Sequence, residues 1–409
     1  MKKKSLLFIA YHFPPILGSS GVLRSLAFTR HMANSDWHTV VLSASLRSYE
    51  KWSEKQISML PDNVEVIRAF ARNSAKSFSI KGKYFAFMAQ PDNLQSWIVG
   101  GVISGFRAIK KHKPDVIIST YPIASAHIIG YVLHRLSGIP WVADFRDPMA
   151  QEGYPSNVTT RKIFQWIERK AVQHCHRILV TTKGTQALYQ ARFSTANKQL
   201  FECIPNGYDE VAFAEVTASK CQSNKILILH SGIIYPSERD PSDLFKAIAT
   251  LKNNDQLCSE NVEVRLRATG HDGLFQPIID EMGIGDIVKL QPIIPYSEAL
   301  AEMLSADGLL LMQADNCNYQ VPAKTYEYIY AQKPILGLMP SEGDTGRLLM
   351  DFSHCLLAPL DNSELIAKSM LEFLECIEKK EPINVEERGQ YSRQYQAKRF
   401  EKVLNQIFE

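Results

Sequence analysis

Short runs of apolar and β-branched residues recur along the chain, and segments long enough for a helix separate them. Within each run the apolar residues are continuous, which is typical of strands covered on both faces. Strands that alternate with helices predict parallel sheets and doubly wound α/β domains. The predicted strands are residues 6–10, 39–44, 64–70, 115–120, 141–145, 177–182, 202–206, 225–232, 262–270, 287–293, 308–313, 334–339 and 355–360.

This alternation is interrupted near residues 206–224, where the turn-forming PNGYD is followed by the polar, aperiodic TASKCQSNK. We therefore predict two Rossmann-like domains, residues 1–210 and 222–387. An amphipathic pattern near the end predicts a helix at about 388–409 that packs back on the first domain. Ligands of open parallel sheets bind outside the carboxyl ends of the strands, so two such domains facing each other would enclose a central cleft.

Length and composition narrow the class of protein. The 409 residues exceed what one ordinary core holds, and no stretch reaches the roughly 18 apolar residues of a membrane span. The N-terminal apolar run is followed by Pro14 and Pro15 and lacks a cleavage site, so we expect a cytoplasmic protein. The seven cysteines include no Cys-x2-Cys pair, and we expect no metal site.

Charge is distributed unevenly between the two halves. Residues 1–200 hold 27 Lys and Arg against 11 Asp and Glu, whereas residues 201–409 hold 19 against 32. The basic half suggests an anionic partner, such as the inner face of the plasma membrane. The alternative is two domains of opposite charge that attract each other. The basic residues follow no nucleic-acid-binding motif, so we expect no nucleic acid partner.

The sequence AYHFPPILGSSGVLRSL, which follows the first predicted strand, has the features of an anion-binding loop. Two prolines end the strand, because neither can donate to a ladder. Gly18 and Gly21 leave the backbone open to a ligand. The helix that follows would direct its free N–H groups at a phosphate. The alternative is an ordinary tight turn, and the glycine spacing is not that of a dinucleotide-binding loop.

A matching loop, LHSGIIYPSERD, opens the second half. It turns at Gly232 and carries Arg239 at the start of a predicted helix, where an arginine can pair with a diphosphate. The alternative is a solvated charge beside two acidic neighbours. Gly270, which ends the next predicted strand, belongs to the same predicted donor-binding set.

The segment VPAKTYEYIYAQKPILG predicts a helix and then a strand. Lys324 and Glu327 lie three residues apart and share a helix face, so they either pair with each other or face a ligand. The rest of the helix is apolar and aromatic, and it follows a strand end. A carboxylate there suits a ribose diol, and an ammonium suits a phosphate.

Five motifs together resemble the GT-B glycosyltransferases of family 4, which are retaining enzymes. These are YHFPPILGSSGVLRSL, IPWVADFRDP, IPNGYD, LHSGIIYPSERDP and VPAKTYEYIYAQKPIL, in family order. The resemblance implies two Rossmann-like domains and transfer from a nucleotide sugar, UDP- or GDP-linked, with retained anomeric configuration. It also implies that no cofactor or divalent metal is needed. The pattern resembles a subgroup of bacterial surface-polysaccharide assembly: O-antigen, capsule or exopolysaccharide.

The resemblance also assigns residues. Glu327 matches the second glutamate of the family's Glu-x7-Glu element, which implies contact with the ribose, while Tyr319 occupies the place of the first. Lys324 is a replacement cation for the leaving diphosphate. Arg239 resembles the family's diphosphate-binding basic residue. In DFRDP, Arg146 aligns with the family's histidine near the donor sugar.

Asp144, in the same DFRDP motif, is our candidate for a contact with a sugar hydroxyl. The alternative is a helix cap or a partner of Arg146. The implied chemistry is electrostatic, because cations and helix N-termini would stabilise the charge that develops on the diphosphate.

The acceptor is expected on the first domain. Residues 79–113 mix aromatic, apolar and lysine residues, and they could rest on an anionic leaflet and receive a lipid-linked polyprenyl diphosphate acceptor or an oligosaccharide. The alternative is an ordinary covered helix with a basic end. Two other functions stay open: a nucleotide-sugar 2-epimerase on the same fold, and a non-catalytic GT-B partner protein.

Overall fold

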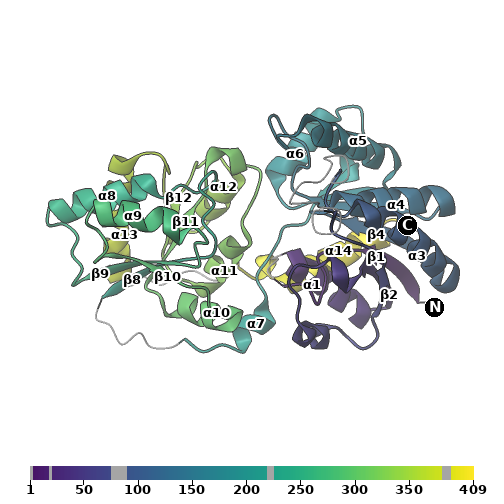
Figure 1. The fold of residues 1–409 in the computed structure, drawn as a ribbon, viewed down its shortest axis with the longest axis horizontal. Coiled ribbons are helices and arrows are strands. Elements are labelled where there is room, and N and C mark those ends of the chain that lie inside the picture. Colours follow the sequence, from purple (N-terminus) through teal and green to yellow (C-terminus); the bar gives the residue numbers. More distant parts are fainter. Residues whose placement is uncertain (1–2, 18–20, 75–89, 219–224, 380–387) are drawn as a thin grey trace. The chain divides into compact units, whose positions relative to one another are not determined.

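The computed structural model describes residues 3–17, 21–74, 90–218, 225–379 and 388–409, which form two compact units (Figure 1). The first unit comprises Met1–Asn206 with Arg393–Glu409, and the second comprises Gly207–Ser392. Each unit has one parallel sheet with helices on both faces. The prediction of two doubly wound α/β domains is therefore confirmed. A cleft between the two domains stays a prediction.

The first unit contains a seven-stranded sheet of order β3-β2-β1-β4-β5-β6-β7, in which all neighbours are parallel. The chain runs outward from β1 in one direction and from β4 in the other, so the strand order reverses between them. The carboxyl ends of β1 and β4 therefore flank the switch point of this sheet. The strands are β1 (Lys4–Ile9), β2 (Trp37–Ala44), β3 (Glu65–Ala69), β4 (Val116–Thr120), β5 (Trp141–Arg146), β6 (Arg177–Val180) and β7 (Phe201–Cys203).

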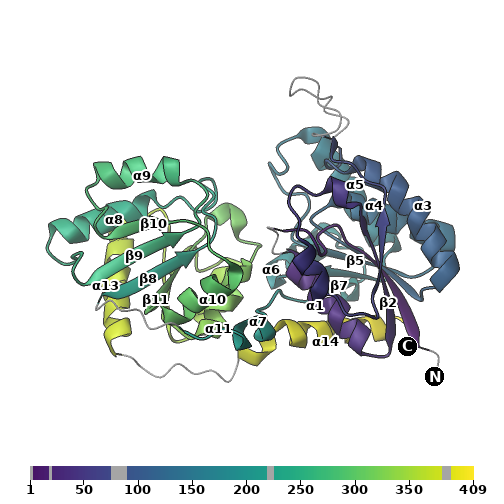
Figure 2. The same cartoon turned by 60° about the horizontal axis from the view of Figure 1, so that its bottom comes forward.

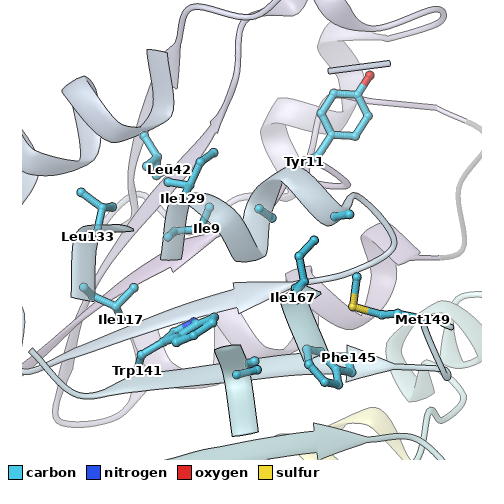
Figure 3. Close-up of a cluster of buried hydrophobic side chains, with 14 of the residues drawn as sticks. Ile9, Tyr11, Leu42, Ile117, Ile129, Leu133, Trp141, Phe145, Met149 and Ile167 are labelled. Carbon is cyan, nitrogen blue, oxygen red and sulfur yellow. The ribbon is translucent and has the colours of Figure 1, made fainter. Parts of the chain in front are cut away.

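Two apolar layers, one on each face of this sheet, explain why most of its strands are continuous runs of apolar residues. One face of the sheet packs against α3, α4, α5 and α6, and Figure 3 shows Trp141 and Phe145 of β5 in this layer beside Ile129 and Ile167. The opposite face packs against α1 and α14. Strands buried on both faces need apolar residues at every position. The helices are α1 (Gly21–Asn34), α3 (Gln95–His112), α4 (Ala124–Ser137), α5 (Val158–His174), α6 (Lys183–Arg192) and α14 (Arg393–Asn405).

The last helix, α14, belongs to the first unit although it follows the second unit in sequence. The rings of Phe400 and Phe28 stack with centroids 4.3 Å apart, and His31 Nε2 lies 2.7 Å from Glu401 Oε2. α14 thus lies along α1, as Figure 2 shows. Apolar residues on one face of α14 explain why this terminal segment returns to the first sheet.

The second unit contains a six-stranded parallel sheet of order β10-β9-β8-β11-β12-β13, with its switch point between β8 and β11. Its strands are β8 (Ile226–Ser231), β9 (Val262–Arg267), β10 (Val288–Gln291), β11 (Gly308–Met312), β12 (Ile335–Leu338) and β13 (Cys355–Ala358). Its helices are α7 (Glu210–Ala214), α8 (Ser242–Asn253), α9 (Asp272–Glu281), α10 (Tyr296–Ser305), α11 (Ala323–Ala331), α12 (Asp344–Met350) and α13 (Ser363–Lys379).

The domain boundaries differ slightly from the predicted ones. Residues 207–210 and 388–392 belong to the second unit, not to the first. The backbone N–H of Tyr208 donates to the carbonyl of Tyr391 at 3.1 Å, and the Asp209 side chain caps α7. These contacts hold both connecting segments on the second unit, and α14 begins only at Arg393.

Candidate active site

The switch point of the second unit brings together the ends of β8 and β11. Ser231 is the last residue of β8 and Gly232 follows it, while α11 comes after β11 in the chain. The backbone N–H of Ser231 donates to the Tyr328 hydroxyl at 2.9 Å, so α11 is fixed against the end of β8. Of the predicted site residues, this arrangement places Gly232, Lys324 and Glu327 at one edge of one sheet.

Gly232 has a backbone conformation and surroundings that require glycine. Its φ is +122°, a value that side-chain-bearing residues rarely adopt. A Cβ atom at Gly232 would lie 2.9 Å from Nζ and 3.3 Å from Cε of Lys324. The lysine side chain thus passes directly over the bare backbone of this turn. This contact supports the prediction that the two residues act at one site.

Lys324 is held by a histidine that the sequence analysis does not single out. The Lys324 Nζ atom lies 3.1 Å from Nε2 of His230, and Nδ1 of His230 lies 2.9 Å from the carbonyl oxygen of Leu310. Burial is the main cause that lowers the pKa of Lys324 to about 7, and the nearby Arg239 lowers it further, while Glu327 raises it. The sequence signal for His230 is a polar residue near the end of an apolar strand, two positions before a glycine.

Glu327 lies one helical turn after Lys324 and is 7% exposed. Its Oε1 atom accepts a hydrogen bond of 2.8 Å from the hydroxyl of Tyr296 on α10. Lys324 and Glu327 are thus each hydrogen-bonded to another element, which favours a ligand-facing role over a surface ion pair.

Arg239 lies in the loop after β8, three residues before α8 begins, so the prediction that it stands at the start of the helix is wrong. One of its nitrogens donates to the Ile233 carbonyl at 3.1 Å, and its guanidinium lies over the Tyr235 ring at 5.6 Å from the centroid. The prolyl residues around it and the cap of Ser242 by Asp240 delay the helix start. Arg239 remains partly exposed and can meet an anion.

Arg239 also lines a cavity of about 660 Å³ at the carboxyl ends of β11, β12 and β13. Lys324, Glu327 and Gly232 do not line this cavity. Its wall carries five carboxylates, which would repel a diphosphate: Asp240, Asp243, Asp315, Glu342 and Asp361. This wall disfavours an anion in the cavity, and contact of Arg239 with a diphosphate stays a prediction.

Gly270 follows β9 with a φ of +75°, which favours glycine. A Cβ atom there would meet Ile233 at 3.6 Å, an ordinary contact distance. The Ile234 N–H donates to the Thr269 carbonyl at 3.0 Å, so this turn supports the loop that carries Arg239. Its contact with the donor stays a prediction.

The first unit has its own charged cluster at the end of β5. Arg24 of α1 forms a two-point pair with Asp144, at 3.0 and 3.1 Å, and the Thr120 hydroxyl donates to Asp144 at 2.9 Å. Asp144 is 1% exposed. Burial raises its pKa, but the guanidinium groups of Arg24 and Arg146 outweigh burial and hold the pKa below its usual value. Asp144 is thus primarily the partner of Arg24, and its contact with a sugar stays a prediction.

Arg146 sits at a bulge in β5 with a φ of +61°. Its guanidinium donates to the Gly21 carbonyl at 3.2 Å and to the hydroxyls of Ser25 and Thr120 at 3.0 and 3.1 Å. Burial lowers its pKa to about 10. Gly21 is the first residue of α1, so Arg146 ties that helix start to β5. Gly18 lies outside the described residues.

Arg24 is the residue of this cluster that the sequence analysis missed. Besides Asp144, it donates to the carbonyls of Ile204 and Pro205 at 2.9 Å each. It thereby joins α1, β5 and the end of β7. The only sequence signal that the Arg24 side chain is buried is its position on an otherwise apolar face of α1.

Within residues 3–17, 21–74, 90–218, 225–379 and 388–409, no group of three or more His, Cys, Asp or Glu side chains could hold a metal ion. In these same ranges, no helix has the length and apolar character needed to cross a membrane.

Comparisons with known proteins bear on the fold of the chain and on its first unit. Residues 22–207 match the model of the glycosyl transferase 4-like domain. Sucrose-phosphate synthase from Thermosynechococcus elongatus has a similar structure, with a TM-score of 0.71 and 11% identity over 99% of both chains. HepE from Anabaena in complex with UDP-glucose has a TM-score of 0.66 and 13% identity over 98% of this chain and 99% of that one.

WaaG, a glycosyltransferase involved in lipopolysaccharide biosynthesis, has a TM-score of 0.61 and 14% identity over 97% of this chain and 99% of that one. UDP-N-acetylglucosamine 2-epimerases also share the fold, at 10% and 11% identity. A sequence search of curated proteins found no match. Residues 22–207 therefore match a glycosyl transferase 4-like domain, and the whole chain shares the GT-B fold of these solved structures, as its motifs predict.

Proposed function

We propose that the protein is a retaining, metal-independent glycosyltransferase that moves a sugar from a nucleotide sugar to a lipid-linked or saccharide acceptor in bacterial polysaccharide synthesis. The observation that carries the proposal is the position of the Lys324 ammonium, which His230 holds over the bare backbone of Gly232. Arg239 and Glu327 complete a set of groups suited to a ribose diphosphate. The relation to WaaG supports the polysaccharide role.

The donor would lie along the switch point of the second unit. Glu327 accepts from Tyr296 through Oε1, and a carboxylate can accept several hydrogen bonds, as contact with a ribose diol requires. The diphosphate would then rest over Gly232, between Lys324 and Arg239. The complex of HepE with UDP-glucose supports a UDP-linked donor, and a GDP-linked donor is the alternative.

The proposed chemistry needs stabilisation of charge more than a protein base. The bond between the anomeric carbon and the diphosphate oxygen breaks, and negative charge accumulates on that oxygen while the sugar gains oxocarbenium character. Lys324 and Arg239 would stabilise this charge better in the transition state than in the ground state. The departing phosphate oxygen takes the proton of the acceptor hydroxyl as the new glycosidic bond forms.

The acceptor side is assigned to the first unit, which carries most of the basic residues. On α3, Val99 and Ile103 are 65% and 49% exposed, and Lys110 and Lys111 lie near the end of the same helix. Exposed apolar and basic side chains on one helix suit the surface of an anionic leaflet. We therefore propose peripheral contact with the inner face of the plasma membrane; the part of this segment at residues 79–89 lies outside the described residues.

A binding screen followed by product analysis tests the function. Nucleotides and nucleotide sugars that bind the folded chain should raise its thermal midpoint by mass action. Each donor that binds is then incubated alone and with lipid-linked or oligosaccharide acceptors. Sugar transfer only in the presence of acceptor supports the proposal. Conversion of the donor alone to its 2-epimer would favour the epimerase, and binding without turnover on any acceptor would favour a non-catalytic partner.

A further inference from the structure

His230 is fixed as a hydrogen-bond acceptor toward Lys324. The carbonyl oxygen of Leu310 can only accept, so Nδ1 of His230, 2.9 Å away, carries the ring proton. Nε2 then offers a lone pair, and the Lys324 nitrogen donates to it across 3.1 Å. His230 is completely buried, and burial, with Lys324 next, holds its pKa well below the usual value. The imidazole is therefore neutral.

The groups that face the Lys324 nitrogen leave its charge poorly compensated. From β8 comes the neutral His230, and from the loop after β8 comes the cation Arg239. The opposing carboxylate is Glu327, on the same helix, and it accepts from Tyr296. With a pKa of about 7, the amine is about half protonated at neutral pH when no donor is bound.

A bound diphosphate changes this balance, because it brings negative charge against both Lys324 and Arg239. We propose that donor binding is coupled to the uptake of a proton by Lys324, and that His230 is the positioning residue that holds the amine over Gly232 for this step. The lone pair of the neutral amine takes a proton from solvent, and the ammonium then pairs with the diphosphate. The inference rests on the proposed placement of the donor.

The proposed coupling predicts that the affinity for the donor decreases as the pH rises above 7. Below pH 7 the amine is already protonated, so binding takes up little. Above pH 7 the binding of each donor requires Lys324 to take up a proton from solvent. The affinity for the donor should therefore fall by about tenfold per pH unit, until the pH reaches the pKa of the ammonium in the complex. At pH 8 the terminal phosphate of a free nucleoside diphosphate is already ionised, so the probe contributes little to this dependence.

Titration calorimetry of the full chain with UDP and with GDP, at pH 7 and pH 8, measures the proton directly. At each pH the heat is compared in HEPES and in Tris, whose ionisation enthalpies differ. We expect uptake of about half a proton at pH 7 and nearly one at pH 8. Lys324→Arg, which keeps a permanent charge, should bind with no uptake and a flat pH dependence. Lys333→Arg, in the turn after α11, is the matched control and should behave like the wild type.

Histidine variants test the positioning role. His230→Phe keeps a buried ring but removes the acceptor, so the midpoint of proton uptake should move to lower pH, and the affinity for UDP should fall. His230→Gln, whose amide oxygen can accept, should recover part of the change. A thermal midpoint is measured for each variant, and Lys324→Arg decides the question should a histidine variant fail to fold.

The outcomes separate this inference from the proposed function. Binding of UDP or GDP with no proton uptake at pH 8 would overturn the coupling but leave the donor site in place. Uptake that persists in Lys324→Arg would also overturn it, because another group would take the proton. The absence of binding by both nucleotides would overturn the coupling and count against the donor site as well.

Discussion

The charged clusters at the carboxyl ends of the two sheets differ in how their charges are compensated. In the first unit, Arg24 and Asp144 meet directly in a buried two-point pair, and Arg146 lies against the same carboxylate at 3.6 Å. In the second unit, Lys324 and Glu327 hydrogen-bond to the neutral His230 and Tyr296. Charges that pair with each other are compensated within the fold, whereas a charged side chain held by a neutral group, as Lys324 is by His230, can gain an opposite charge from a ligand.

The largest effect should come from breaking the pair in the first unit. Asp144→Asn would leave two buried guanidinium groups without their carboxylate, and we expect a loss of about 3–5 kcal/mol in the free energy of unfolding. Urea denaturation followed by a signal from the first unit measures this loss. Replacing both partners with apolar residues, as in Arg24→Met with Asp144→Leu, should recover much of the stability. An Asp144→Asn protein of unchanged stability but impaired sugar transfer would instead support direct contact with the sugar.

In the second unit, loss of a cation should impair catalysis more than folding. Lys324→Met removes a charge that would meet the departing diphosphate, and we expect kcat to fall by about 10²- to 10³-fold. Steady-state kinetics with saturating donor measures the change, and Lys333→Met serves as the control. Unchanged kcat in Lys324→Met would show that the second cluster, like the first, serves the fold.

The sequence predicts the fold more completely than it predicts the contacts within these two clusters. Apolar runs mark each strand in the described parts of the chain, and they are continuous in central strands such as β4 and β11, which are buried on both faces, whereas β9 alternates apolar residues with Glu263 and Arg265. The spacing of Lys324 and Glu327 places them on one helix face, because a helical turn is a local property. Arg24 and Asp144 lie 120 positions apart, and their pairing depends on how α1 packs against β5. No local sequence pattern predicts a contact between residues so far apart in the chain.

The hydrogen bonds of His230 are equally unpredictable from the sequence, although the motif that contains His230 is recognisable. The motif LHSG indicates a strand end and a turn, but the partner of the imidazole is a carbonyl on β11, 80 residues later. Its tautomer, and with it the hydrogen bond to Lys324, follows from that tertiary contact. The residue types of a site can therefore be read from the sequence where secondary structure alone sets them, but their hydrogen-bonding roles cannot.

A methyl group at the turn between β8 and α8 should have an intermediate effect. Gly232→Ala would strain a backbone of φ +122° and place Cβ against the Lys324 amine, and we expect a cost of about 1–3 kcal/mol together with weaker nucleotide binding. Thermal unfolding with and without nucleotide measures both. Gly273→Ala, in α9 with open space around the position, should be neutral or slightly stabilising. Equal effects of the two substitutions would argue against a special role for Gly232.

The smallest effect, and the most specific one, should follow from Glu327→Ala. If Glu327 binds the ribose diol, its loss weakens the binding of a ribonucleotide by about tenfold, or 1.4 kcal/mol. The comparison of UDP with 2′-deoxy-UDP isolates this contact: the wild type should prefer UDP, and Glu327→Ala should bind the two nearly equally. Glu364→Ala, in the first turn of α13, is the control and should keep the preference. If Glu327→Ala still prefers UDP to 2′-deoxy-UDP, another group recognises the 2′-hydroxyl, and the ribose does not lie against Glu327.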